Sequence, residues 1–171
     1  MHSTHLAVCQ RGAIWATRPP ASLRGVSDHG SAGPDSALVV LVYSDDRTAR
    51  QQVMLALGRR PAAELPAVRY LECATLPAVI RAMDAGGIDL AVLDGEAVPA
   101  GGMGVCRQLK DEIFRCPPIL VLTGRPQDAW LATWSRADAV VPRPLDPMVM
   151  ADAAAALLRQ RLAGMPALLM P

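Results

Sequence analysis

The sequence predicts an α/β domain in which a doubly wound, five-stranded parallel sheet carries helices on both of its faces. Four short runs of Val, Ile, Leu and Ala are almost uninterrupted, which is typical of strands buried on both faces of a parallel sheet. The segments between these runs have the lengths and the end signals of helices. Strands that alternate with helices in this way form a parallel sheet through right-handed crossovers.

The predicted elements follow one another along the chain with short turns between them. The strands are expected at residues 37–43, 68–73, 90–93, 119–122 and 139–141. The helices are expected at about residues 47–57, 76–85, 104–113, 126–136 and 147–162. Gly58 ends the first helix, and Gly86 with Gly87 ends the second, because glycine readily adopts the conformation that follows a helix. Pro126 suits a first helical turn.

Residues 1–36 differ in composition from the rest of the chain. They carry Arg-Pro-Pro and Gly-Ser-Ala-Gly-Pro segments and show no hydrophobic period, so we expect a disordered N-terminal extension. Alternatively, translation starts downstream, for instance at Val26, and the residues before it are not part of the protein. Residues 37–163 are expected to form one domain, followed by a C-terminal tail at residues 164–171.

The composition excludes several classes of function. Hydrophobic residues make up 51% of the chain and charged residues 19%, which is enough to build a buried core. Acidic and basic side chains are equal in number from residue 37 onward, so no nucleic-acid partner is expected. No apolar stretch approaches the roughly 20 residues of a membrane span. Residues 37–171 contain no histidine, which excludes Ser-His-Asp catalysis and the usual zinc sites there.

The cysteines indicate a reducing environment. Cys9, Cys73, Cys106 and Cys116 form no Cys-x-x-Cys pair and have no metal-ligand spacing. We therefore expect reduced, mostly buried thiols in a cytoplasmic protein.

Polar side chains follow four of the predicted strands, at the point where each strand ends. Because the carboxyl ends of strands in an open α/β sheet meet in one crevice, where ligands bind, these side chains are expected to lie together. They are Ser44, Asp45 and Asp46 after the first strand, Asp94 after the third, Thr123 after the fourth and Arg143 after the fifth. An acidic cluster, a hydroxyl and a cation in one place suit a divalent metal ion and a phosphoryl group.

These segments resemble the receiver domain of two-component response regulators, which has the chemotaxis-regulator-like, or flavodoxin-like, fold. The resemblance covers about residues 37–163, and several motifs match in order and spacing. It implies the strand order 2-1-3-4-5 and a site at the carboxyl ends of the strands. It also implies that Asp94, with Pro99 five residues on, is the phosphoacceptor. A carboxylate there takes a phosphoryl group from a phosphohistidine or a small phosphodonor and becomes an aspartyl phosphate.

The resemblance implies Mg²⁺ as a cofactor. Asp45 matches the direct metal ligand, Asp94 is a second ligand, and Glu96 offers its backbone carbonyl. Ser44 stands where the family usually has an acidic residue, so Mg²⁺ is expected to bind more weakly. Asp46 is at most a weak ligand, although Asp45 and Asp46 together are an alternative acidic pair.

One further position matches the family, and two depart from it. Thr123 matches the hydroxyl residue that bonds the phosphoryl group. Arg143-Pro144 stands in place of Lys-Pro, which the family joins by a cis peptide bond. The planar guanidinium of arginine keeps the charge of lysine but differs from its ammonium group in shape. Two explanations of the exchange remain open: near-neutral drift in an arginine-rich sequence, and relaxed selection on phosphotransfer. Val140 replaces the aromatic residue that usually follows the threonine during switching.

Trp130 and Trp134 lie one helical turn apart in the predicted fourth helix. We expect at least one of these indoles to be part of the core. An exposed Trp134 is instead a natural anchor for a partner protein, since tryptophan is enriched at interface hot spots.

Three functions remain open from the sequence. The first is a stand-alone, atypical receiver in a phosphorelay, without enzymatic activity beyond its own phosphorylation. Its partners would be a sensor histidine kinase or another phosphodonor, and a protein effector bound by the fourth helix, fifth strand and fifth helix. The second is a pseudo-receiver that binds partners independently of phosphorylation. The third, a small flavodoxin-like nucleotide-binding enzyme, is disfavoured because the turn after the first strand is acidic and lacks glycine.

Overall fold

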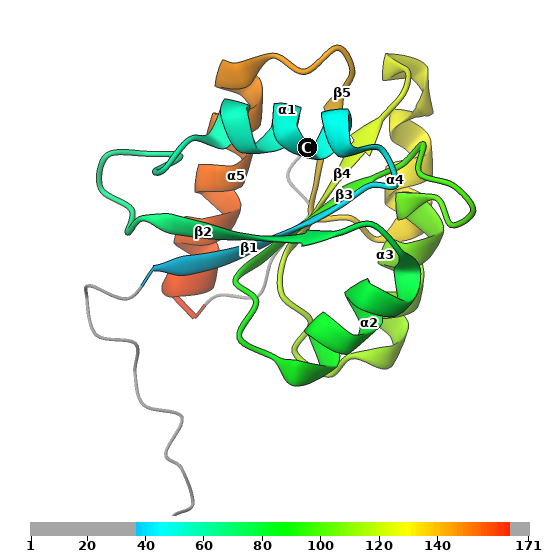
Figure 1. Cartoon of the computed structure of the whole chain (residues 1–171), viewed down its shortest axis with the longest axis horizontal. Coiled ribbons are helices and arrows are strands. Elements are labelled where there is room, and N and C mark those ends of the chain that lie inside the picture. Colours follow the sequence, from blue (N-terminus) through cyan, green and yellow to red (C-terminus); the bar gives the residue numbers. More distant parts are fainter. Residues whose placement is uncertain (1–36, 165–171) are drawn as a thin grey trace, which may run out of the picture. The chain divides into compact units, whose positions relative to one another are not determined.

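The computed structural model describes residues 37–164, except for the side chains of Pro126, Ala129 and Ala132. Within this part of the chain a five-stranded parallel sheet has the order β2-β1-β3-β4-β5 (Figure 1). The predicted fold class and strand order are therefore confirmed. The expectations for residues 1–36, and for all but the first residue of the tail, lie outside the described residues. No helix within residues 37–164 is long and apolar enough to cross a membrane.

The secondary structure follows the predicted alternation closely. The strands are β1 (Leu38–Tyr43), β2 (Val68–Cys73), β3 (Leu90–Asp94), β4 (Ile119–Thr123) and β5 (Ala139–Pro142). The helices are α1 (Arg47–Leu57), α2 (Leu76–Ala85), α3 (Gly102–Glu112), α4 (Ala129–Ser135) and α5 (Pro147–Leu162). A 3₁₀ turn, η1 (Pro126–Asp128), precedes α4, so the predicted fourth helix is in fact two shorter elements. The helix α3 begins two residues earlier than expected.

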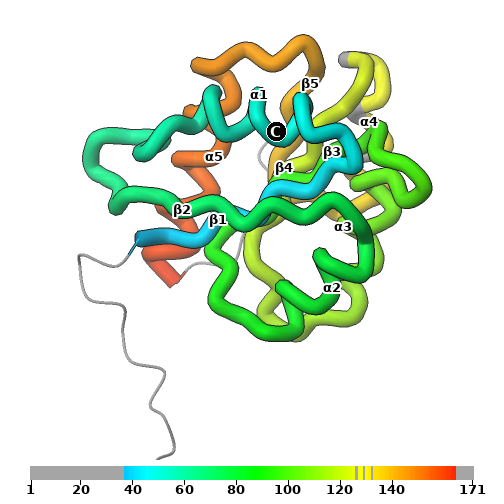
Figure 2. The backbone as a smooth tube through the Cα atoms, viewed as in Figure 1, coloured from blue at the N-terminus to red at the C-terminus, as the bar shows by residue number. Residues whose placement is uncertain are grey.

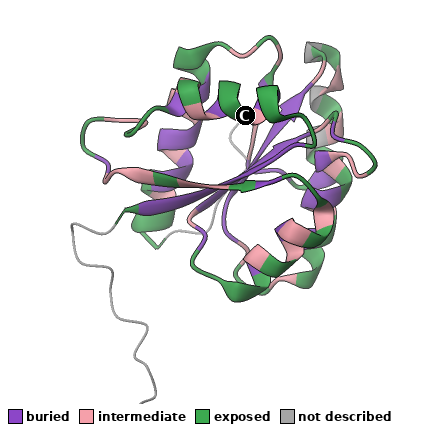
Figure 3. Cartoon of the chain, viewed as in Figure 1, coloured by how far each residue is buried: buried purple, intermediate pink, exposed green. Residues whose placement is uncertain are grey.

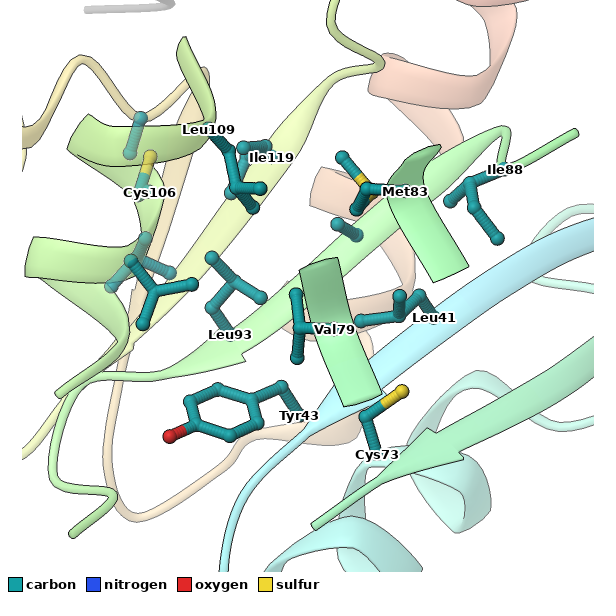
Figure 4. Close-up of a cluster of buried hydrophobic side chains, with 14 of the residues drawn as sticks. Leu41, Tyr43, Cys73, Val79, Met83, Ile88, Leu93, Cys106, Leu109 and Ile119 are labelled. Carbon is teal, nitrogen blue, oxygen red and sulfur yellow. The ribbon is translucent and has the colours of Figure 1, made fainter. Parts of the chain in front are cut away.

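The core forms on both faces of the sheet, as the uninterrupted apolar runs predict. Every residue of β1, β3 and β4 is buried. Alternate residues of β1 point to opposite faces: Leu41 packs among residues of α2 and α3, and Val42 among residues of α1 and α5. Figure 2 shows these two helix pairs on the two sides of the sheet, and Figure 3 shows the buried strands between them. Figure 4 shows one of these two layers around Leu41, Val79 and Leu109.

Local interactions fix the ends of the elements. Asp46 caps α1 by accepting a hydrogen bond from the amide of Thr48, and Asp146 caps α5 in the same way. Lys110 of α3, the only lysine of the chain, forms a largely buried ion pair with Asp138, which also accepts from a backbone amide of β4. This pair ties α3 to the segment between α4 and β5.

The expectation that a tryptophan of the fourth helix belongs to the core is wrong. Trp130 is 68% exposed and Trp134 is 55% exposed. Residues four apart lie on one side of a helix, so the two indoles share an environment, and here that side faces solvent. Among the described side chains of this helix, Ser135 at its end is fully buried, and Ala137 just beyond it is also buried.

Candidate functional site

The candidate site lies at the carboxyl ends of β1, β3, β4 and β5. Asp94 is the last residue of β3 and pairs in register with Leu122 of β4. Thr123 is the last residue of β4 and pairs with Pro142 of β5. Because the strands are parallel and in register, their last residues meet at one edge, as the sequence predicted.

The carboxylate of Asp94 is buried and fully engaged by donors from three segments. Its Oδ2 accepts a hydrogen bond from Ser44 Oγ at 2.7 Å and from Arg143 Nη2 at 2.8 Å. Its Oδ1 accepts from the backbone amide of Glu96 at 3.1 Å. Asp94 is only 3% exposed, so these contacts supply the compensation that a buried carboxylate requires. The structure thus brings Ser44, Asp94 and Arg143 into direct contact.

The two acidic residues after β1 have different environments. Asp45 is exposed, and its carboxylate accepts from the amide of Val98, in the loop that follows Asp94. The carboxylate of Asp46 caps α1, while its backbone amide donates to Ser44 Oγ at 3.1 Å. Asp45 therefore faces the β3–α3 loop, and Asp46 serves the start of the helix.

Two buried polar atoms beside Asp94 have no hydrogen-bond partner among the described residues. They are the hydroxyl of Thr123 and the Nε of Arg143. The backbone joins their residues, because the amide of Arg143 donates to the carbonyl of Thr123 at 2.8 Å. Buried polar groups are normally bonded, so an unpaired hydroxyl and an unpaired N–H at one strand edge are exceptions to the usual pattern. The Arg143–Pro144 peptide bond is cis, as the family resemblance implies.

Two glycines let the backbone and a side chain approach this edge closely. A Cβ atom on Gly102 would lie 2.5 Å from the carbonyl oxygen of Asp94, so only glycine fits there. A Cβ atom on Gly124 would lie 2.7 Å from Cδ of Glu96. The side chain of Glu96 therefore lies over Gly124.

Tyr43 is a site residue that the sequence interpretation missed. Its phenol donates to the carbonyl of Ala100 at 2.6 Å and so holds the loop after Asp94 against the end of β1. Burial raises the pKa of Tyr43, and the negative charges of Asp45 and Asp94 raise it further. A tyrosine at the end of an apolar run gave no signal beyond membership of the core.

Arg50 is the second residue that was missed. It donates from Nη1 to the carbonyl of Ser44 at 2.7 Å and from Nε to Glu72 at 2.9 Å. Arg50 lies one turn into α1 and close in sequence to the acidic turn, and this position could have indicated its contact with that turn.

The residues at this edge have the type of ligand atom that a magnesium ion prefers, although they supply only two carboxylate charges. The exposed Asp45 carboxylate, the buried Asp94 carboxylate and the carbonyl oxygen of Glu96 are hard oxygen donors of the type that Mg²⁺ prefers. Residues 37–164 contain no group of three or more His, Cys, Asp or Glu side chains that could hold a metal ion. The hydroxyl of Ser44, which donates to the Asp94 carboxylate, adds no negative charge.

The comparisons with known proteins agree with this geometry. No protein-family model matches the sequence. Two curated proteins of Mycobacterium tuberculosis, from strains CDC 1551 and H37Rv, are each 62% identical to the chain over 128 residues. The aligned part is 74% of this chain and 96% of each relative, and both relatives are named as uncharacterized response regulatory proteins. The chain therefore belongs to the response regulator family and contains the receiver domain of two-component signalling.

Solved structures show the same fold at low sequence identity. A response regulator of the LuxR family from Aurantimonas is 24% identical with a TM-score of 0.61, covering 78% of this chain and 91% of that one. A chemotaxis response regulator of Vibrio cholerae is 17% identical with a TM-score of 0.58, covering 71% and 99%. The BeF₃-activated DrrB receiver domain, from Thermotoga maritima, is 19% identical with a TM-score of 0.58, covering 72% and 99%.

Proposed function

We propose that this protein is a stand-alone receiver that accepts a phosphoryl group on Asp94 and acts through contacts with other proteins. The observation that carries the proposal is the buried Thr123 hydroxyl, which has no partner within the described part of the chain. A phosphoryl group on Asp94 would bring acceptor oxygens to this hydroxyl and to the guanidinium of Arg143. Leaving such a hydroxyl unbonded costs about 1–3 kcal/mol, so the phosphorylated form would recover a loss present in the unmodified form.

The proposed reaction is nucleophilic attack by a carboxylate oxygen of Asp94 on the phosphorus of the donor. The bond from phosphorus to the donor's imidazole nitrogen, or to a small donor's leaving group, breaks as the new P–O bond forms. The leaving group departs with the bonding electron pair; an imidazole then takes a proton from solvent or stays neutral according to its ring nitrogens, and acetate from acetyl phosphate stays as the anion. Arg143, already 2.8 Å from Asp94, stays beside the product as a counter-charge.

Mg²⁺ is the proposed cofactor, and when bound it would neutralise negative charge on the phosphoryl oxygens. Asp45, Asp94 and the carbonyl of Glu96 are the residues that would hold it. Ser44 contributes a neutral hydroxyl where a carboxylate would add charge, so we expect weak metal binding.

Stand-alone action is supported by the relatives, because the aligned residues fill 96% of their length. A cytoplasmic location is supported by the free thiols of Cys73, Cys106 and Cys116. The proposed partners are a sensor histidine kinase or another phosphodonor, and an effector protein. The effector would bind the face made by α4, β5 and α5, where the exposed Trp130 and Trp134 offer anchors.

A second candidate function is a phosphorylation-independent interaction module. It is favoured by the bonds from Ser44 and Arg143, which already satisfy the Asp94 carboxylate in the unmodified protein. Val140, which is partly buried against the core, also provides no aromatic ring to respond to a phosphoryl group.

Phosphate-affinity electrophoresis of the full chain, incubated with acetyl phosphate and Mg²⁺, tests the proposal. We expect a shifted band for the wild type and none for Asp94→Ala or Asp94→Asn. The band should disappear after brief alkaline treatment, because acyl phosphates hydrolyse readily. If no shifted band forms with acetyl phosphate at saturating Mg²⁺, the interaction module becomes the better assignment.

A further inference from the structure

Arg50 of α1 joins the end of β2 to the turn that carries Asp45. Its Nη1 donates to the carbonyl oxygens of Ser44, at 2.7 Å, and of Asp45, at 3.4 Å. Its Nε donates to the carboxylate of Glu72 at 2.9 Å. The side chain of Arg50 is only 12% exposed, so the guanidinium is held in a largely desolvated place. A rigid fork of donors suits such multiple contacts better than a single ammonium group does.

The contacts of Arg50 continue into the candidate site. Ser44, whose carbonyl accepts from Arg50, donates its hydroxyl to Asp94 and accepts from the amide of Asp46. A hydrogen-bonded path therefore crosses the carboxyl ends of the neighbouring strands β2, β1 and β3. Its members are Glu72, Arg50, Ser44 and Asp94.

We infer that Arg50 is a positioning residue for the candidate site. It fixes the turn of Ser44 and Asp45, so that the hydroxyl of Ser44 reaches Asp94 and the carboxylate of Asp45 stays beside the β3–α3 loop. Arg50 acts through this turn, because its hydrogen bonds go to Glu72 and to the carbonyls of Ser44 and Asp45 and not to Asp94. The inference deepens the proposed function and rests on it for one of its two readouts, the affinity for Mg²⁺.

The charge of Arg50 and its positioning role predict opposite effects on metal binding. A cation beside an acidic site repels Mg²⁺, so removing the charge of Arg50 should by itself tighten metal binding. Removing the hydrogen bonds should loosen the turn of Asp45, and ordering that turn again on binding has a cost in free energy. The direction of the change therefore separates the two roles.

Calorimetric titration of the full chain with Mg²⁺ gives the first readout. Arg50→Ala is expected to weaken binding by about fivefold or more, which is a free-energy change that calorimetry resolves easily. Arg50→Lys should recover part of the loss. Arg47→Ala is the matched control, because Arg47 lies on the same helix, is exposed, and its side chain makes no hydrogen bond or ion pair with residues 37–164. Its affinity should stay at the wild-type value or rise slightly, and tighter binding by Arg50→Ala would overturn the inference.

Hydrogen exchange at the amide of Asp46 gives a second readout that needs no metal. This amide donates to Ser44 Oγ, so it reports on the order of the turn. Exchange should be about fivefold faster or more in Arg50→Ala, and unchanged in Arg47→Ala, if the turn opens more often. Amides of β3 should keep their rates, which separates a loosened turn from a loosened fold.

An unchanged rate at Asp46 in Arg50→Ala would reject the positioning role, whatever the metal does. If the wild type itself binds no Mg²⁺, the metal part of the proposed function fails, while exchange at Asp46 still decides the role of Arg50.

Discussion

The hydroxyl of Ser44 donates a hydrogen bond to the carboxylate of Asp94 at 2.7 Å, across the ends of β1 and β3. A donor thus occupies the place where a receiver would usually carry a second carboxylate. Arg143 donates to the same oxygen, so the chain itself compensates the buried charge of Asp94. In the unmodified protein the carboxylate of Asp94 therefore has its hydrogen-bond donors, while the hydroxyl of Thr123, at the end of the adjacent strand, has no partner among the described residues.

Ser44→Asp should destabilise the metal-free protein and strengthen its binding of Mg²⁺. The new carboxylate would lose the bond to Asp94 and repel it, which should destabilise the metal-free fold by about 1–3 kcal/mol. The same carboxylate should tighten Mg²⁺ binding, by about tenfold if it coordinates the ion. Urea unfolding with and without Mg²⁺, together with calorimetry, measures both effects. Ser44→Ala is the control that removes the bond without adding charge, and equal Mg²⁺ affinity in Ser44→Asp and wild type would mean that residue 44 does not face the metal.

Thr123→Val should leave the unmodified fold as stable as the wild type, or stabilise it by up to about 1 kcal/mol. Valine keeps the shape of threonine and removes a buried hydroxyl that has no partner. The same change should lower the yield of the Asp94 phosphoform, because the bond from the hydroxyl to the phosphoryl group is lost. Urea unfolding and phosphate-affinity electrophoresis are the two measurements. A destabilisation above about 1 kcal/mol would instead show that the hydroxyl is bonded in the unmodified protein.

Arg143→Lys should retain phosphorylation of Asp94, whereas Arg143→Gln should reduce it strongly. Both arginine and lysine supply a cation to Asp94, which Arg143 now contacts at 2.8 Å, but glutamine supplies none. Loss of the ion pair should also destabilise Arg143→Gln, because it leaves the buried Asp94 charge partly uncompensated. Time courses with acetyl phosphate, beside thermal unfolding, separate the two effects. Equal phosphorylation in Arg143→Gln and wild type would show that this cation is not used.

Modification of Asp94 should change the face of α4, β5 and α5 only slightly. Val140 of β5 provides no ring to follow a movement of Thr123, so the two states differ little in the contacts that a partner would meet. A partner bound there, with Trp134 as anchor, should bind wild type, Asp94→Ala and beryllofluoride-treated protein with similar affinity. A difference beyond about tenfold, or 1.4 kcal/mol, would restore a phosphorylation-driven switch.

Trp134→Ala should weaken such a partner, because the exposed indole is then lost from the contact surface. Leu162→Ala is a useful comparison, since Leu162 is exposed to the same degree at the far end of α5.

The fold was predictable because its signals are local. Apolar runs marked four of the five strands, and glycines marked the ends of α1 and α2, where Gly58 and Gly86 have positive φ values. Asp94, Thr123 and Arg143 were expected to lie together because the carboxyl ends of parallel strands meet at one edge of the sheet. This rule depends on topology and needs no knowledge of side-chain contacts.

The remaining features of the site depend on contacts between distant residues. The hydrogen bond from Tyr43 to the carbonyl of Ala100 joins positions 57 residues apart, and no periodic pattern in the sequence predicts it. The same holds for Arg50, whose partner Glu72 is on the edge strand β2. The spacing of Trp130 and Trp134 shows that they share a side of α4, but packing alone decides whether that side is buried.

The ion pair of Lys110 with Asp138 has a practical consequence for work with this protein. The chain has one ε-amino group in all, and it is only 12% exposed and bonded to a carboxylate. Reagents that couple to amines at neutral pH should therefore leave the folded domain almost untouched and react first with the α-amino group, whose ordinary pKa is about 7.7–8.0. Dyes or surface attachments made in this way should carry one label per molecule and leave Lys110 unmodified.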